Sequence, residues 1–341
     1  RVGTRRVCDA LVRVWERHGQ FGQFVDSLTG DVVVGGSTSG AIIPAALCHA
    51  ATFFDQAQYL EVACDAAEKY YREFTAQGLS CGGPGDALQN PDSESWYSLV
   101  ESYVALYEST ADRRWLDRAG EAARQFSTWV VAYDYTFPPD STFAKAAIHS
   151  AGAVYANTQN KHAAPGICTF SGLALLKLFR ATGDLFFADL LREIAFGLPQ
   201  YLPHPLHRIG AVTVGRMCER VNLTDWEGPE RIGETLGMST WAETSLMLTA
   251  IEIPGVYVQP DRRVVLAFDN ITAQAIADND GQFVVRLLNP TPAPASVTVL
   301  CESSAEARWP LPEAHLWGCP TEQLQPGESR VIVFAQTACL V

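Results

Sequence analysis

The chain has 341 residues, of which 48% are hydrophobic and 18% are charged, so it can bury a large core and has room for two domains. A formal net charge of −13 at pH 7 argues against a nucleic acid or an anionic membrane surface as a partner. No uninterrupted apolar run reaches the roughly 18–20 residues of a membrane span, and the first residues do not have the pattern of a signal peptide.

Helical patterns dominate the first part of the chain. Apolar side chains at helical spacing predict a helix over 4–18, and the Gly-rich, β-branched stretch 19–40 is typical of a hairpin-like excursion. Residues 41–54 are apolar nearly all round, which predicts a buried helix, whereas 56–76 is amphipathic, with charge on one face.

A repeated unit follows, in which a long loop precedes an apolar helix and a short turn leads to an amphipathic helix. The loops span 78–92, 133–166 and 203–239, the apolar helices 93–108, 171–181 and 240–252, and the amphipathic helices 113–130 and 185–201. The two short turns share a Thr-x-Asp pattern, in which Asp112 and Asp184 are expected to be helix N-caps. Short turns make neighbouring helices antiparallel, which places every long loop on one face.

This pattern predicts a mainly α fold, an α/α toroid over 1–254 with buried helices inside and amphipathic helices outside. After Pro254, short β-branched runs separated by Pro, Gly and Asp turns predict a small all-β sandwich domain over 255–341. About eight helices are recognised, fewer than a closed ring of six hairpins needs. We therefore expect an incomplete toroid, or one that an upstream segment completes.

The nine cysteines are scattered without CxxC or other metal-ligand spacing. Several, such as Cys48 and Cys64, fall at apolar helix positions, where cysteine acts as a small buried hydrophobe. We therefore expect mostly free thiols and a cytoplasmic location. The sequence has no Gly-rich phosphate loop, GxSxG elbow or HExxH motif, so nucleotide, serine-esterase and zinc-protease functions lack support and we expect no metal and no cofactor.

The first group of candidate site residues lies where the helix at 93–108 begins. Asp92 and Glu94 stand there beside Gly-rich backbone that also carries Asp86, and either Asp92 or Ser93 is expected to be the N-cap. The dipole of the helix stabilises a carboxylate at this end. The segment is either a cap and nothing more, or a loop that presents catalytic carboxylates.

The second group lies in the loop before the helix at 171–181. It combines side chains that hydrogen-bond to sugar hydroxyls or meet a carboxylate: His149, Tyr155, Asn157, Asn160, Lys161 and His162. A single histidine is usually structural, whereas a cluster of polar and proton-handling groups on one loop is typical of a binding or catalytic rim. The alternative is a solvated loop whose His and Asn side chains cap their neighbours.

The third group lies within 215–234, where carboxylates alternate with arginines around an aromatic ring. Asp225 and Glu227 flank Trp226, and Arg220 precedes them. An aromatic platform flanked by carboxylates and arginine is typical of a carbohydrate site. The alternative is a salt-bridged surface loop.

Three blocks resemble the six-hairpin glycosidase superfamily, and within it a bacterial exo-β-glucuronidase family with a C-terminal β-domain. They are GQFVDSLTGDVVVGGSTSGAI, GGPGDALQNPDSESWYSLVESYVALYE and ANTQNKHAAPGICTFSGLALL. The likeness covers about residues 19–250. It implies an α/α toroid, metal-free glycoside hydrolysis and a uronate-bearing substrate.

The main hypothesis is a β-glucuronidase-like hydrolase that removes a terminal uronic acid from a glycan or glycoside. Hydrolysis needs one carboxylic acid and one carboxylate base or nucleophile. Glu94 or Asp92 is the candidate for one, and Glu227 or Asp225 for the other. The expected uronate ligands are Arg220, His149 and His162, with Trp226 stacked on the sugar ring.

Two alternatives remain open. A polysaccharide lyase on the same toroid would use Tyr155, Asn157 and His162 to remove a proton next to the uronate carboxyl group. A catalytically silent glycan-binding subunit would fit the shortfall in helices. The carbohydrate is the expected partner in each case, and the apolar content and acidic surface also suit a homo-oligomer.

Overall fold

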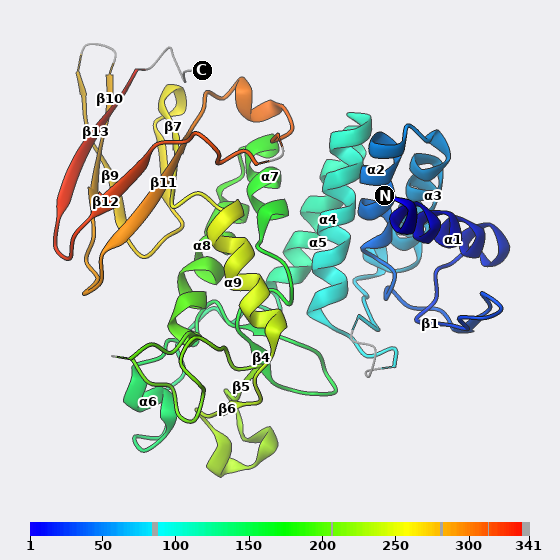
Figure 1. The fold of residues 1–341 in the computed structure, drawn as a ribbon, viewed down its shortest axis with the longest axis horizontal. Helices are drawn as coiled ribbons and strands as arrows, with labels where there is room; N and C mark the ends of the chain where they lie inside the picture. Colours follow the sequence, from blue (N-terminus) through cyan, green and yellow to red (C-terminus); the bar gives the residue numbers. More distant parts are fainter. Residues whose placement is uncertain (84–87, 206, 280–281, 313, 336–341) are drawn as a thin grey trace. The chain divides into compact units, whose positions relative to one another are not determined.

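The computed structural model of the chain describes residues 1–83, 88–205, 207–279, 282–312 and 314–335. These residues form two compact units (Figure 1). The first unit consists of Arg1–Val131, Val154–Ala164 and Asn222–Ile232, and the second of Ala132–Ala153, Pro165–Val221 and Gly233–Val341. The predicted division into domains 1–254 and 255–341 stays a prediction.

The first unit is built from five helices. They are α1 (Val2–His18), α2 (Ile43–Phe54), α3 (Ala57–Glu73), α4 (Ser93–Thr110) and α5 (Arg113–Ser127). Helix α2 packs against α3, and α4 against α5, as two antiparallel hairpins, and α2 also packs against α4. Helix α4 has buried side chains around most of its circumference, whereas α5 buries a single stripe of side chains. The predicted contrast between inner and outer helices therefore holds within this unit.

The predicted excursion after α1 is a small antiparallel hairpin of β1 (Phe24–Val25) and β2 (Val32–Val34). The Asp26 carboxylate accepts the N–H groups of Leu28 and Thr29 at 2.8 and 2.9 Å, which fixes its turn. Two further short strands of the first unit, β3 (Val154–Tyr155) and β4 (Ala163–Ala164), pair antiparallel, and an isolated bridge joins Val154 to Val130.

The Thr-x-Asp turns have the geometry that the sequence predicts. In the first unit, Asp112 accepts the N–H of Arg114 at 3.0 Å, and Thr110 Oγ1 donates to Leu106 O at 2.7 Å. In the second unit, the corresponding bonds join Asp184 to Phe186 and Thr182 to Leu178, at the same distances. The short turn between α2 and α3 differs, because Asp55 ends α2 in the left-handed region and Gln56 precedes α3 without a side-chain cap bond.

The helices of the second unit are α6 (Thr142–Ala146), α7 (Leu173–Thr182), α8 (Leu185–Gly197) and α9 (Thr240–Glu252). Helices α7 and α8 form a hairpin, and α8 continues into a 3₁₀ turn over Leu198–Tyr201. The short strands β5 (Arg220–Val221) and β6 (Thr235–Leu236) pair antiparallel.

The second unit ends in a β-sandwich of two sheets. One sheet has the order β13-β10-β9 and the other β12-β11-β7-β8. The strands are β7 (Val256–Gln259), β8 (Val264–Ala267), β9 (Thr272–Asn279), β10 (Gln282–Leu288), β11 (Ala295–Cys301), β12 (Thr321–Leu324) and β13 (Ser329–Ala335). Alternate side chains from both sheets, such as Val258, Val285 and Val299, form one apolar core between them.

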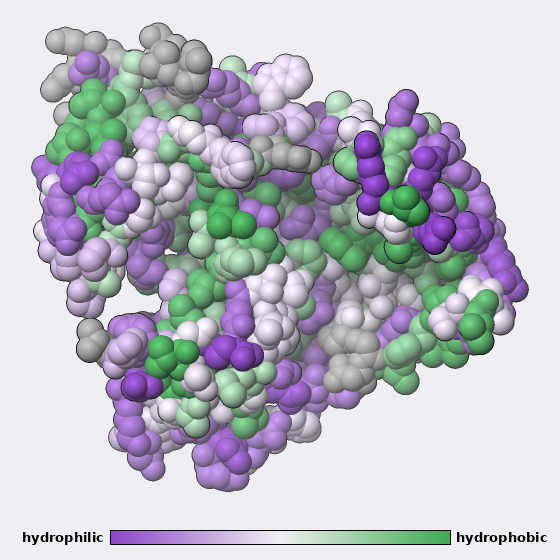
Figure 2. All heavy atoms as spheres, in the orientation of Figure 1, coloured by the Kyte–Doolittle hydropathy of each residue, from purple (hydrophilic) through white to green (hydrophobic). Residues whose placement is uncertain are grey.

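The outer face of this sandwich is partly apolar. On β13, Ile332 and Phe334 pack on the core, and the alternate residues Val331 and Val333 are each 52% exposed. Figure 2 shows hydrophobic residues at the surface on the side of these strands, beside hydrophilic ones.

Helical hairpins followed by a β-sandwich confirm the predicted fold class. The described part of the chain holds nine α-helices, one of them only five residues long, so it has fewer helices than a ring of six hairpins needs. No helix among the described residues is both long enough and apolar enough to cross a membrane. The eight cysteines in the described ranges are all free thiols, as predicted, and burial raises the pKa of Cys48 to about 12.

Candidate functional site

Two of the predicted loop segments meet within the first unit, at the N-terminus of α4, and the third contacts the second through one pair of side chains. Asp92 and Asn157 form an isolated antiparallel bridge. The Ser93 N–H donates to Ala156 O at 3.0 Å, and the Thr158 N–H donates to Pro91 O at 3.1 Å. The segment before α4 and the loop after β3 are therefore joined through their backbones.

Asp92 is the N-cap of α4, and its side chain is fully buried. One carboxylate oxygen accepts the Ser95 N–H at 2.6 Å, and the other accepts the Gly83 N–H at 3.1 Å. Burial raises the pKa of Asp92, while these backbone donors oppose the shift. A Cβ on residue 83 would overlap the Asp92 carboxylate, so glycine is required for the backbone to approach it.

Glu94 lies in the first turn of α4 and is partly exposed. Of the two predicted carboxylates at this helix, Asp92 is thus enclosed and Glu94 is accessible. Asp86, the third carboxylate of this predicted group, lies outside the described residues.

The loop after β3 uses several of its polar side chains to hold its own shape. Asn157 is buried, and its side-chain oxygen accepts the N–H groups of Gln159 and Asn160 at 3.1 and 2.8 Å. His162 is also buried, with Nδ1 3.0 Å from Ala163 O. The Asn and His side chains that a lyase would need are therefore enclosed.

The third loop meets the second through Lys161 and Trp226. The Lys161 ammonium nitrogen lies 3.7 Å from the centroid of the Trp226 ring, a cation–π contact, and the tryptophan is 50% exposed. Trp226 is the middle residue of a 3₁₀ turn, Asp225–Glu227, whose two carboxylates are exposed. The aromatic platform, a cation and two carboxylates thus occupy neighbouring positions.

Tyr155 lines a cavity of about 440 Å³ in the same unit. The cavity is bounded by Pro91, just before Asp92, and by Trp96 and Trp129. The rings of Tyr155 and Trp129 lie 6.3 Å apart, and burial raises the pKa of the Tyr155 hydroxyl group. This hollow is of a size for a small ligand.

The remaining two predicted residues, His149 and Arg220, belong to the second unit. His149 Nδ1 lies 2.7 Å from the Asp134 carboxylate, and Arg220 Nε lies 3.5 Å from the Glu219 carboxylate. Both side chains therefore have carboxylate partners of their own.

The first unit thus combines accessible carboxylates, a cation, an exposed aromatic ring and hydrogen-bonding groups. Such a set can bind a polyhydroxylated acid and can transfer protons to and from it. Among the described residues, no group of three or more His, Cys, Asp or Glu side chains is placed to hold a metal ion. Sequence reasoning placed Lys161 among the polar groups of its loop, but its contact with Trp226 depends on the folded loop.

No protein-family model matches the chain, and no curated protein matches it. Among solved structures, the chain is similar to a crystal structure of unsaturated glucuronyl hydrolase from Bacillus sp. GL1, a protein described as responsible for the degradation of glycosaminoglycan. The two have 15% sequence identity and a TM-score of 0.44, over 70% of this chain and 64% of that one. The match thus covers less than two thirds of that chain, and a likeness this weak assigns neither a family nor an activity.

Proposed function

We propose that this chain acts as a glycoside hydrolase, of β-glucuronidase type, that releases a terminal uronic acid. The observation that supports this proposal best is the linkage of three segments in the first unit. Backbone hydrogen bonds join the start of α4, which carries Glu94, to the loop that carries Lys161, and Lys161 contacts Trp226 of the third segment. Each loop supplies a different kind of group that the reaction needs: a carboxylate, a cation and a ring platform.

The acid and base roles go to accessible carboxylates. One carboxylic acid gives its proton to the leaving glycosidic oxygen as the bond to the anomeric carbon breaks. The second carboxylate either attacks that carbon or removes a proton from the water that does so. We assign these roles to Glu94 and to Glu227 or Asp225. Asp92 is a positioning residue, because both its oxygens are occupied in holding the loop and helix α4.

We assign to Lys161 the role of binding the uronate carboxylate. Lys161 is an exposed residue, and its ammonium group contacts the ring of Trp226, so it is a cation that an acidic sugar can reach. Its position over Trp226 would bring the carboxylate of the sugar close to the aromatic ring. His162 is buried, and Arg220 and His149 already have carboxylate partners, so none of these three takes this role in the proposal.

The test is turnover of p-nitrophenyl β-D-glucuronide, with the matching glucoside as the control substrate. We expect release of p-nitrophenol from the glucuronide alone. Lys161→Met keeps the aliphatic stem but removes the charge, and it should raise KM for the glucuronide more than it lowers kcat. Matching rates on both substrates would contradict the uronate assignment.

Two other outcomes would overturn the hydrolase itself. An unsaturated product absorbing in the near ultraviolet, formed from a uronate-containing polysaccharide, would indicate a lyase. Glycan binding that persists without turnover, and that survives conversion of Glu94 and Glu227 to amides, would indicate a binding subunit.

A further inference from the structure

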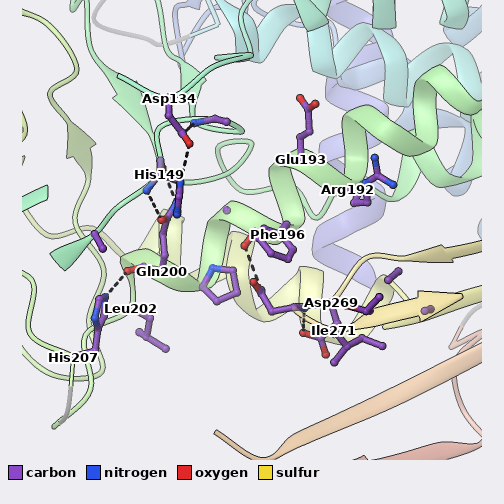
Figure 3. Close-up of a pocket in the computed structure, with 18 of the residues that line it drawn as sticks. Asp134, His149, Arg192, Glu193, Phe196, Gln200, Leu202, His207, Asp269 and Ile271 are labelled. Atoms are coloured by element: carbon purple, nitrogen blue, oxygen red, sulfur yellow. Dashed lines mark hydrogen bonds and ion pairs between the residues drawn. The ribbon is translucent and has the colours of Figure 1, made fainter. Parts of the chain in front are cut away.

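The second unit contains a cavity of about 940 Å³ that the proposed function does not use (Figure 3). Its walls come from segments far apart in the sequence: the loop with Asp134 and His149, the end of α8, residues 199–204 and 207, and the connection from β8 to β9. The volume lies within the range of ligand pockets, and both apolar and polar side chains line it.

His149 is held in place on one wall of the cavity although its side chain is 72% exposed. Asp134 fixes the ring through Nδ1 at 2.7 Å, as Figure 3 shows. The Gln200 side chain fixes the backbone, because it accepts the His149 N–H and donates to the His149 carbonyl group, each at 2.8 Å. An exposed side chain normally keeps its rotamer freedom, so ordering it in advance lowers the entropic cost of binding a ligand.

Phe196 supplies an apolar platform on another wall and is 51% exposed, at the end of α8. The Asn270 side chain donates to the Phe196 carbonyl group at 3.3 Å, which ties the β8–β9 connection to this helix. Asp269 precedes Asn270 and also lines the cavity (Figure 3). An aromatic face and a carboxylate are therefore presented from two elements that are bonded to each other.

Gly152 allows the His149 loop to lie directly on α8. A Cβ on this residue would overlap the carbonyl oxygen of Glu193, and its φ of 84° lies in the left-handed region. The loop and helix are therefore in backbone contact behind the cavity, which keeps its two walls at a fixed spacing.

The charges that line the cavity disfavour an acidic ligand. Three carboxylates line it, those of Asp134, Glu193 and Asp269, and the one arginine among its lining residues, Arg192, pairs with Asp189 at 3.0 Å. A second anion would add to this negative potential. Hydroxyl groups can donate to carboxylates and accept from imidazole or guanidinium groups, and a sugar ring presents an apolar face to an aromatic side chain.

We infer that this cavity is a binding site for a neutral saccharide, with Phe196 as the ring platform and with His149, Asp269 and Glu193 as partners of the hydroxyl groups. The site takes a different chemical class from the uronate-binding group of the first unit. The inference does not depend on the proposed hydrolase activity.

Saturation-transfer NMR on the full chain tests this inference. The probes are the methyl β-glycopyranosides of D-glucose, D-galactose and D-mannose, and methyl β-D-glucuronide is the acidic control. We expect transfer to at least one neutral glycoside, with Phe196→Ala weakening its binding roughly five- to ten-fold, the size of one aromatic contact. Phe53→Ala is the matched control, because Phe53 is a similarly exposed phenylalanine of the first unit, at 59%.

Three results would overturn the inference: no transfer to any neutral glycoside, equal loss in the Phe196 and Phe53 variants, or preferential binding of the glucuronide that Phe196→Ala removes. Turnover of the aryl glucuronide by Phe196→Ala, measured in parallel, should equal that of the unmutated protein. The binding measurement can therefore refute the neutral saccharide site without refuting the proposed hydrolase, and the turnover measurement can do the reverse.

Discussion

Arg180 on α7 and Glu302, directly after β11, form a buried, two-point ion pair. Nε and Nη2 of the guanidinium group each lie 2.6 Å from a carboxylate oxygen, and 4% and 9% of the two side chains are exposed. The Tyr257 hydroxyl group also donates to Glu302 at 2.8 Å. This network joins a helix of the second unit to its β-sandwich, and every charged atom in the pair is hydrogen-bonded.

Glu302→Gln should therefore destabilise the second unit strongly, because it leaves the Arg180 charge buried without its counter-ion. A loss of about 3–5 kcal/mol in the free energy of unfolding is typical of such a change. Urea unfolding followed by tryptophan fluorescence measures it. Glu322→Gln removes one of the two carboxylate partners of the half-exposed Arg330, which keeps its pair with Glu328 at 2.6 Å. This change should cost at most about 1 kcal/mol. Equal losses would show that the buried pair contributes no more than the exposed one.

Gly152→Ala should also destabilise the protein, for a steric reason that can be isolated. Gly152 and Gly215 have nearly the same backbone φ, 84° and 80°, so alanine costs about 1 kcal/mol of backbone strain at either position. At Gly215 the added Cβ meets nothing within 4 Å, whereas at Gly152 it overlaps Glu193 O. The overlap should add about 1–3 kcal/mol. Thermal unfolding of both variants gives the difference, and equal melting temperatures would refute the close approach of the loop to α8.

Asp92 should make the stability of the first unit depend on pH in an identifiable direction. Its pKa is raised above the ordinary value of 3.8 because the side chain is buried. The folded state therefore holds its proton more tightly than the unfolded state, so the contribution of Asp92 to stability falls as pH rises from below 3.8 through the folded-state pKa. Asp92→Asn keeps the N-cap oxygen and removes this titration.

Urea unfolding of the unmutated protein and of Asp92→Asn at a series of pH values separates this effect from those of the other carboxyl groups, which both proteins share. The stability of the unmutated protein minus that of the variant should decrease as pH rises across this window. A difference that stays constant, or that increases, would show that the carboxyl group is not stabilised in its protonated form.

Local chemistry explains which parts of the fold the sequence predicts well. The Thr-x-Asp turns depend on hydrogen bonds between residues two to four positions apart, so Asp112 and Asp184 are recognisable as caps without any tertiary information. Helix α9 matches its predicted range, 240–252, for a similar reason. Strand β9 (Thr272–Asn279) has no predicted counterpart, because its run TAQAIADN is rich in alanine and polar residues and pairs through tertiary context.

In the candidate sites, too, the sequence predicts local features better than contacts that depend on the folded chain. Short turns make neighbouring helices antiparallel, which predicts that the long loops share a face. The bridge between Asp92 and Asn157 agrees with this prediction for two of the loops. Which side chains remain accessible depends on the folded loop. Asn157 and His162 are enclosed, whereas Lys161, whose φ is 50°, reaches the Trp226 ring. The cavity of the second unit joins residues from Asp134 to Ala273, which no local pattern could assemble.

Replacing the accessible carboxylates by amides should separate chemistry from binding. Glu94→Gln, Glu227→Gln and Asp225→Asn keep the shape of each side chain and remove its proton-transfer capacity. The general acid and its carboxylate partner should each lower kcat on the aryl glucuronide by about 10²–10⁴-fold, with KM changing far less. Of Glu227 and Asp225, only the one that takes part should show this loss.

Glu230→Gln is the matched control for these variants, because Glu230 is an exposed carboxylate in the 3₁₀ turn directly after Asp225–Glu227. Its kcat should stay within about two-fold of the unmutated value, since it removes the same charge from the same loop without a role in proton transfer. A comparable loss in Glu230→Gln would mean that the loop acts only through its total charge. Unchanged kcat in Glu94→Gln would remove α4 from the catalytic site.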